Sequence, residues 1–203
     1  MTTHHNTQSV QGNSPIQLDD IRAALMGEFH FNTSLTDQEQ SRANLRAQYI
    51  YDITQMGFDW FVTLTFRYKK TDHDEVAGLA REFFGLLSRD LYGKRSKKRV
   101  IHYAAIEKHK DGSYHIHAVI KQPGPDSPLN QSEVRTLIKG KWHEVASTNL
   151  DMSSSGNDSE RDWFRPINPA ELFEVGQYIT KDCYRYDDTI IYDLCCLTGR
   201  KVG

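Results

Sequence analysis

The stretch from Val100 to Lys121 constrains the fold more than any other part of the chain, because its pattern predicts a complete β-hairpin. Both arms are rich in the β-branched and aromatic residues that strands favour. Between them lie residues 110–112, Lys-Asp-Gly, and a three-residue hairpin loop typically ends in the left-handed conformation that glycine accepts. This loop length sets the register of the two strands and places Glu107 opposite His115.

One face of this hairpin carries the side chains that could do chemistry. His115 and His117 stand two residues apart and share a face with Glu107. The other face is apolar and predicts core: Ala104, Ile106, Tyr114, Ile116, Ala118 and Ile120. One carboxylate and two imidazoles suit Mg²⁺ or Mn²⁺ when phosphate and water complete the shell, and would also admit Zn²⁺, Co²⁺ or Ni²⁺. His109 falls on the same face and is the alternative third ligand to Glu107; the bland alternative is a pair of solvated strand histidines.

The chain divides into three parts by composition and periodicity. Residues 1–16 are polar and without pattern, which predicts a disordered tail. Residues 17–57 show helical spacing in two pieces and predict a helical N-terminal extension, in which Ser34 or Thr36 caps the second helix. Residues 58–203 then form the main domain.

The main domain opens with a strand predicted at residues 58–67. Thr63 and Thr65 lie on one face of this strand, and we expect this open face to line the site and contact DNA. The opposite face is predicted to join the core through Phe58, Trp60, Val62, Leu64 and Phe66.

The remaining pattern completes an α+β fold, a central antiparallel β-sheet with flanking helices. Helices are predicted at residues 72–92 and 131–146. Residues 162–167 predict a short edge strand because they include a proline. A third helix begins after Asn168 and extends past Tyr178, and residues 189–197 predict a last strand.

A basic run lies between the first long helix and the hairpin. It places five positive charges in six residues, Lys94, Arg95, Lys97, Lys98 and Arg99. The formal net charge of the chain is −2, so a nucleic-acid partner is not indicated by overall charge and any basic surface is local. The run is a solvated loop, a patch that grips DNA phosphates or, less favoured, a nuclear-import signal.

Several functional classes are not indicated. No apolar run reaches about 18 residues, so we expect no transmembrane helix. The 3 cysteines, two of them adjacent, do not make a disulfide framework, and a reducing cytoplasm of a bacterial host fits them. The chain has no Gly-x-x-x-x-Gly-Lys-Ser/Thr loop, so no ATP-driven motor is evident.

A tyrosine and a lysine near the C-terminal end of the chain add a second chemical signal. Glu174, Tyr178 and Lys181 are spaced to share one helix face. A phenol is a poor nucleophile at pH 7, but a neighbouring ammonium favours the phenolate and can neutralise charge on a phosphate. A tyrosine on an amphipathic helix is more often packing or surface, so the pair gains weight only beside the hairpin.

Three segments together resemble the motifs of the HUH endonucleases, in particular the rolling-circle replication initiators. They are FVTLTF at residues 61–66, HIHAVI at residues 115–120 and YITKD at residues 178–182. The resemblance implies a fold of ferredoxin-like or RNA-recognition-like kind. It also implies that a tyrosine attacks single-stranded DNA, leaving a 5′-phosphotyrosine link and a free 3′-OH, with no need for ATP.

Carried over residue by residue, the resemblance gives each candidate a role. His115 and His117 match the histidines that bind a divalent metal, Mg²⁺ or Mn²⁺, and Glu107 occupies the place of the third ligand. Tyr178 matches the nucleophile and Lys181 the lysine that follows it. The implied partners are single-stranded or hairpin origin DNA of a bacterial plasmid or phage, and a host helicase and polymerase.

The order and number of tyrosines narrow the type. The tyrosine follows the histidine motif, as in replication initiators and single-tyrosine transposases, and unlike conjugative relaxases. Tyr184 is off the face of Tyr178, which favours a single nucleophile, although Tyr184 and Tyr186 are rivals for that role. The alternatives are a transposase of the same class, a non-catalytic DNA-binding repressor of the same fold, and a different metal phosphoesterase. Histidine-triad hydrolases are disfavoured because positions 113 and 119 are not histidine.

Overall fold

A computed structural model describes residues 16–28, 36–123, 129–146, 163–182 and 195–200 of the chain. The predicted disordered tail lies almost wholly outside these residues, as do Tyr184, Tyr186 and most of the predicted last strand. None of the described helices is long and apolar enough to cross a membrane.

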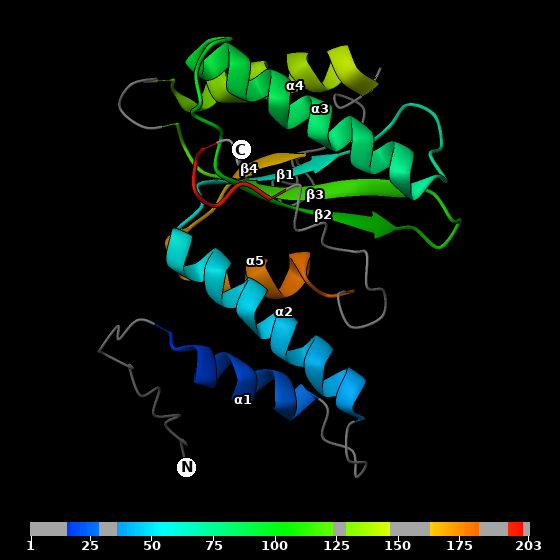
Figure 1. Ribbon diagram of the computed structural model, residues 1–203, viewed down its shortest axis with the longest axis vertical. Coiled ribbons are helices and arrows are strands. Elements are labelled where there is room, and N and C mark those ends of the chain that lie inside the picture. The colour runs from blue at the N-terminus through cyan, green and yellow to red at the C-terminus, as the bar shows by residue number, and fades with distance from the viewer. Residues whose placement is uncertain (1–15, 29–35, 124–128, 147–162, 183–194, 201–203) are drawn as a thin grey trace, which may run out of the picture.

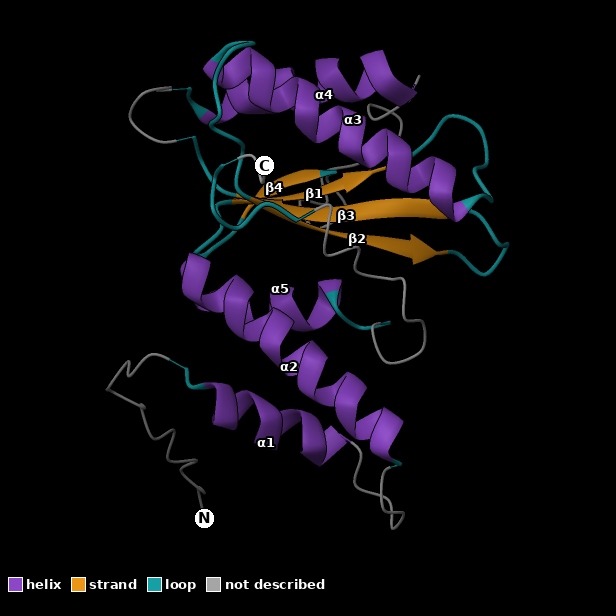
Figure 2. Ribbon diagram, in the orientation of Figure 1, coloured by secondary structure: helices purple, strands orange, loops and turns teal. Residues whose placement is uncertain are grey.

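A four-stranded antiparallel sheet forms the centre of the described chain (Figure 2). Its strands are β1 (Trp60–Leu64), β2 (His102–Lys108), β3 (Tyr114–Ile120) and β4 (Phe164–Pro166), in the order β2-β3-β1-β4. Every neighbouring pair is antiparallel. The predicted α+β class with a central antiparallel sheet is confirmed, and the strand that ends at Pro166 lies at an edge of the sheet, as expected for a strand with proline.

Helices cover both faces of the sheet (Figure 1). On one face lie α3 (His73–Tyr92) and α4 (Gln131–Ala146). On the other lie α2 (Asp37–Met56) and α5 (Leu172–Ile179), with α1 (Leu18–Glu28) packed outside α2. The first long helix begins as predicted, since the Asp72 side chain accepts a hydrogen bond from Glu75 N at 3.0 Å.

The hairpin has the register that its loop predicts. Glu107 pairs with His115. The His109 N–H donates to the Ser113 carbonyl oxygen at 2.7 Å, and Gly112 has a φ of 85°. A residue with a side chain would be strained at that φ, so glycine fixes the loop length and thereby the face on which each strand residue lies.

The sheet separates two cores. The apolar face of the hairpin packs against α3 and α4, in a cluster with Phe83 and Trp142, as its alternation predicts. The second cluster joins the other face to α2 and α5 through Tyr103, Phe61 and Val175. Because this second face also carries Glu107 and the two histidines, the candidate site stands beside a packed helical layer rather than on an open sheet.

Three predictions about elements need correction. The first strand spans only residues 60–64, and Phe58 lies before it, buried in the cluster on the opposite face from Trp60. Alternation assigns faces only within a strand, which is why it misplaced Phe58. The last helix ends at Ile179, so Lys181 lies in a turn beyond it. Of the predicted last strand, the described residues form only an isolated bridge between Cys196 and His102.

The helical extension begins its second helix as predicted from Thr36. The Thr36 hydroxyl accepts from Glu39 N at 3.3 Å, and the Glu39 carboxylate accepts from Thr36 N at 2.8 Å, which makes a capping box. One face of α2 packs on α1 through Ala47 and Ile50, and another reaches the sheet cluster through Tyr49.

Candidate active site

Glu107, His115 and His117 come together on the face of the hairpin that α5 partly covers. The Glu107 Oε2 atom lies 3.0 Å from His117 Nε2 and 3.6 Å from His115 Nε2. The two Nε2 atoms are 2.9 Å apart. Both histidines are buried, and the ligand atoms of all three residues lie within 4.8 Å of one another.

These separations fit a divalent cation. Two ligands at right angles on an ion with bonds of about 2.1 Å stand about 3 Å apart, close to the separations found here. The Thr63 hydroxyl lies 3.1 Å from His117 Nδ1, so an N–H at that atom would leave the Nε2 lone pair facing the group. His115 Nδ1 is buried and has no hydrogen-bond partner among the described residues. The Glu-His-His group could therefore hold a metal ion.

His109, the alternative third ligand, has a different position. Its ring stacks on the ring of His115, with centroids 4.1 Å apart and planes 18° from parallel. The group whose ligand atoms converge consists of Glu107, His115 and His117, without His109. His109 thus packs against the outer side of a ligand in this arrangement.

The protonation states of the group favour metal binding near neutral pH. Burial would raise the pKa of Glu107, but hydrogen bonds with His115, His117 and Lys181 outweigh it and hold that pKa well below its usual value. Burial lowers the pKa of His117 to about 4, although the hydrogen bond with Glu107 opposes this. At pH 7 the site therefore offers an ionised carboxylate and a neutral imidazole at His117, the forms that bind metals.

The hydroxyl of Tyr178 reaches the same group from the last turn of α5. It lies 3.4 Å from His117 Nε2, and the residue is 46% exposed although much of α5 is buried. The edge of the Tyr178 ring contacts Phe61 of β1, with centroids 5.9 Å apart. The phenol oxygen thus stands beside the candidate metal ligands and remains open to a substrate.

Lys181 closes the other side of this arrangement. Its Nζ lies 2.7 Å from Glu107 Oε2 and 4.0 Å from the centroid of the Tyr178 ring. Burial disfavours the ammonium, but the hydrogen bond and charge of Glu107 raise the pKa of Lys181 above its usual value. Lys181 is therefore a fixed positive charge beside the phenol, which favours phenolate and can neutralise a bound phosphate.

Sequence reasoning missed Arg46, which supports the helix that carries Tyr178. Arg46 is buried in α2, and its guanidinium donates to Thr180 Oγ1 and to the Gln177 carbonyl oxygen, both at 3.3 Å. These two acceptors lie on either side of Tyr178 in the chain. The available signal was an arginine among the apolar positions of an amphipathic helix, between Ala43 and Ala47.

The residues predicted to contact DNA lie in different places. Thr63 borders the site through its contact with His117. Thr65 lies beyond the end of β1, and its carbonyl oxygen accepts from Trp142 Nε1 at 2.8 Å. The basic run precedes β2 and is separated from Glu107 by most of that strand. The structure therefore does not bring the basic run next to the metal ligands.

Comparison with known proteins points in one direction. A family model of replication-associated proteins, described by the name ORF2, matches residues 59–183, which include every strand of the sheet, the Glu-His-His group and Tyr178. No curated protein and no solved structure gives a match. Because the match covers more than half of the chain, the protein belongs to this ORF2 family of replication-associated proteins.

Proposed function

We propose that this protein nicks and rejoins single-stranded DNA as an HUH-type endonuclease with one nucleophilic tyrosine, Tyr178, and so initiates rolling-circle replication. The observation that carries the proposal is the 3.4 Å approach of the Tyr178 hydroxyl to His117, a member of a buried Glu-His-His group. Membership of a replication-associated family supports a role in replication initiation.

The proposed reaction exchanges one phosphodiester for another. The Tyr178 oxygen attacks the phosphorus, the bond from phosphorus to the 3′ oxygen breaks, and that oxygen takes a proton to become a free 3′-OH. The phenol proton leaves to solvent or to a neighbouring base. The product is a 5′-phosphotyrosine ester, and attack by a 3′-OH reverses the step, so that rejoining needs no ATP.

Each residue of the site has a part in this reaction. Glu107, His115 and His117 would hold a divalent cation, Mg²⁺ or Mn²⁺, which would polarise the scissile phosphate when bound. Lys181 keeps a positive charge beside the phenol and the phosphate. Arg46 holds the end of α5 and so orients Tyr178 as a positioning residue.

The substrate we propose is single-stranded or hairpin DNA at a replication origin of a plasmid or phage. Thr63 borders the site and would contact the strand near the scissile phosphate, with Thr65 beyond it. The basic residues Lys94, Arg95, Lys97, Lys98 and Arg99 would contact the DNA backbone farther away. A host helicase and polymerase would open and copy the duplex, since the sequence shows no ATP-binding loop.

The test is a nicking assay with labelled single-stranded oligonucleotides and Mn²⁺, read on denaturing gels and by mass spectrometry of the adduct. Wild-type protein is expected to form a covalent adduct at Tyr178. Tyr178→Phe should bind metal and DNA but form no adduct, whereas Lys181→Ala should slow the reaction without abolishing it.

Other outcomes would point elsewhere. A nucleotide attached to Tyr184 or Tyr186, or an adduct that persists in Tyr178→Phe, would overturn the assignment of the nucleophile. Tight binding of hairpin DNA without any adduct would identify a non-catalytic DNA-binding protein of the same fold. Joining of the adduct to an unrelated DNA end, with no activity on origin DNA, would identify a transposase.

A further inference from the structure

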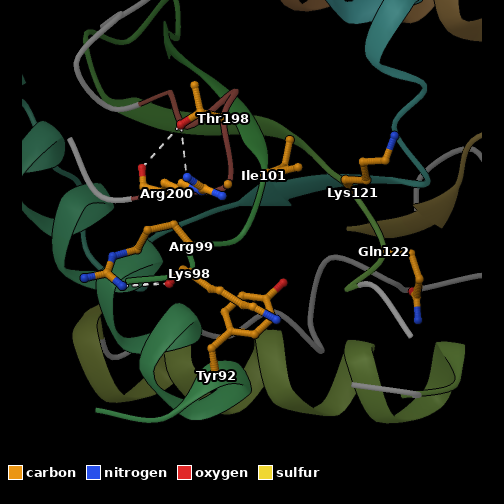
Figure 3. Close-up of a pocket in the computed structure, with 9 residues that line it drawn as sticks. Tyr92, Lys98, Arg99, Ile101, Lys121, Gln122, Thr198 and Arg200 are labelled. Atoms are coloured by element: carbon orange, nitrogen blue, oxygen red, sulfur yellow. Dashed lines mark hydrogen bonds between the residues drawn. The ribbon is translucent and has the colours of Figure 1, made fainter. Parts of the chain in front are cut away.

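Two segments that are far apart in the sequence form a cavity near the start of β2. Residues 94–101, which follow α3, meet the C-terminal segment Cys195–Arg200. Arg99 N donates to the Gly199 carbonyl oxygen at 2.7 Å, and Cys196 exchanges two backbone hydrogen bonds of 3.0 Å with His102. The cavity has a volume of about 320 Å³ (Figure 3) and is lined by Tyr92, Lys98, Arg99, Ile101, Lys121, Gln122, Thr198, Gly199 and Arg200.

The chemistry of this cavity is cationic. Four of the nine lining residues, Lys98, Arg99, Lys121 and Arg200, carry a positive charge, and none of the nine carries a carboxylate. The Arg99 guanidinium donates to the carbonyl oxygens of Ser96 and Lys98, at 2.9 and 2.7 Å. The Lys121 ammonium donates to the Met56 carbonyl oxygen. These acceptors are neutral, so they leave the positive charges of Arg99 and Lys121 in place on the wall.

A cavity of this kind suits an anion with several acceptor oxygens. Arginine presents a planar fork of donors that matches a phosphate, and the Thr198 hydroxyl and the Gln122 amide line the same space. The basic run alone would be a flexible, solvated loop. Its pairing with the C-terminal segment instead fixes the backbone of Lys98 and Arg99 opposite Arg200.

We propose that this cavity binds a backbone phosphate of the DNA strand, at a distance from the phosphate that Tyr178 attacks. The proposal rests on the proposed function and adds a second, separate contact. Ile101 on the cavity wall and Glu107 in the candidate active site stand near opposite ends of β2, roughly 20 Å apart at the rise of a β-strand. That length corresponds to about six phosphates along one strand of a duplex.

The test measures DNA affinity against salt in the Tyr178→Phe background, which separates binding from cleavage. Arg99→Ala with Arg200→Ala is the test variant, and Arg22→Ala with Arg81→Ala, on α1 and α3, is the control with the same change of charge. On DNA that extends well beyond the scissile site, the test variant should lower the slope of log affinity against log salt by about two and weaken binding at least about tenfold at roughly 0.1 M salt. The control should leave both nearly unchanged.

A series of DNA lengths separates this cavity from a general charge effect. On DNA cut to about three nucleotides on either side of the scissile phosphate, the test variant and the control should bind equally, because the strand no longer reaches the cavity. Equal slopes for both variants at every length would overturn the proposal. Stabilisation of the wild-type protein by inorganic phosphate, lost in the test variant without any change in DNA affinity, would overturn it too and identify a small-anion site.

The result does not depend on the nicking reaction. If the wild-type protein forms no adduct but the test variant loses affinity for long DNA, the cavity stands and the proposed chemistry fails. If adduct forms normally and the salt slopes do not differ, the chemistry stands and the cavity has no role in binding DNA.

Discussion

The guanidinium of Arg46 in α2 donates to the Thr180 hydroxyl at the end of α5, at 3.3 Å, and is buried there. The same hydroxyl donates to the Gly176 carbonyl oxygen at 2.7 Å, so the last turn of α5 is bonded both within itself and to α2. The residues matched by the family model begin at residue 59, after α2. A helix outside the shared family region thus holds the helix that carries Tyr178.

Arg46→Ala should therefore affect both stability and the site. The change removes a buried donor group and leaves the Gln177 carbonyl oxygen without this partner, which should lower the free energy of unfolding by about 2–4 kcal/mol. At a temperature where the variant is still folded by circular dichroism, adduct formation should be slower than in the wild type, and Arg46→Lys should recover part of the rate. Leu45→Ala, at the neighbouring exposed position, is the control and should change neither quantity.

Gly176 tests how closely α2 and α5 pack. A Cβ atom there would lie 3.2 Å from Ile50 Cγ2 and 3.4 Å from Ile50 Cα, and Ile50 is fully buried. Gly176→Ala should lower the midpoint of thermal unfolding, since neither helix can shift without loss of packing. Gly140→Ala in α4 meets open space and should instead stabilise by about 0.5–1 kcal/mol. Equal stabilisation by both changes would show that the helices separate easily.

Glu107→Gln tests the metal group with little change of shape. The amide keeps the size of the side chain but removes the negative charge, so Mn²⁺ affinity should fall by at least about a hundredfold, measured by calorimetry. Glu82→Gln on the exposed side of α3 is the control and should bind Mn²⁺ as the wild type does. Unchanged affinity in Glu107→Gln would remove this residue from the ligand set.

The metal-free protein should lose stability as the pH falls. The pKa of His117 is about 4 in the folded chain and near 6.5 when unfolded, so between these values the unfolded chain binds more protons. The free energy of unfolding should then decrease from about pH 6.5 to about pH 4, by roughly 3 kcal/mol from this residue. Urea unfolding across this range should show a shallower decrease for His117→Gln, and parallel curves would contradict the shift.

Much of the candidate site could be predicted because it depends on local rules. The loop that ends at Gly112 fixes the register, and the register alone brings Glu107 opposite His115. Strand alternation then places His117 on the same face. Tyr178 could be linked to this group only through the resemblance of the motifs, since nothing in the hairpin specifies which helix covers it.

The parts that could not be predicted depend on contacts between distant segments. Arg46 meets Gln177 across more than half of the chain, and no periodicity reports such a pairing. The pairing of Arg99 with Gly199 is similar, because an isolated bridge needs neither alternation nor a run of β-formers. Phe58 was misplaced for a related reason: the chain turns before β1, and only the tertiary structure shows where the turn begins.

The packing of α2 on the sheet bears on any attempt to use this protein as a covalent DNA tag. A fusion trimmed to residues 59–183 would expose the underside of the sheet, where Tyr49 and Ile53 now lie, and would leave α5 without its guanidinium partner. Such a tag would be sticky and poorly ordered at the very helix that must present the phenol. A transplantable module therefore has to carry α2 from its cap at Thr36, and the linker belongs ahead of that residue.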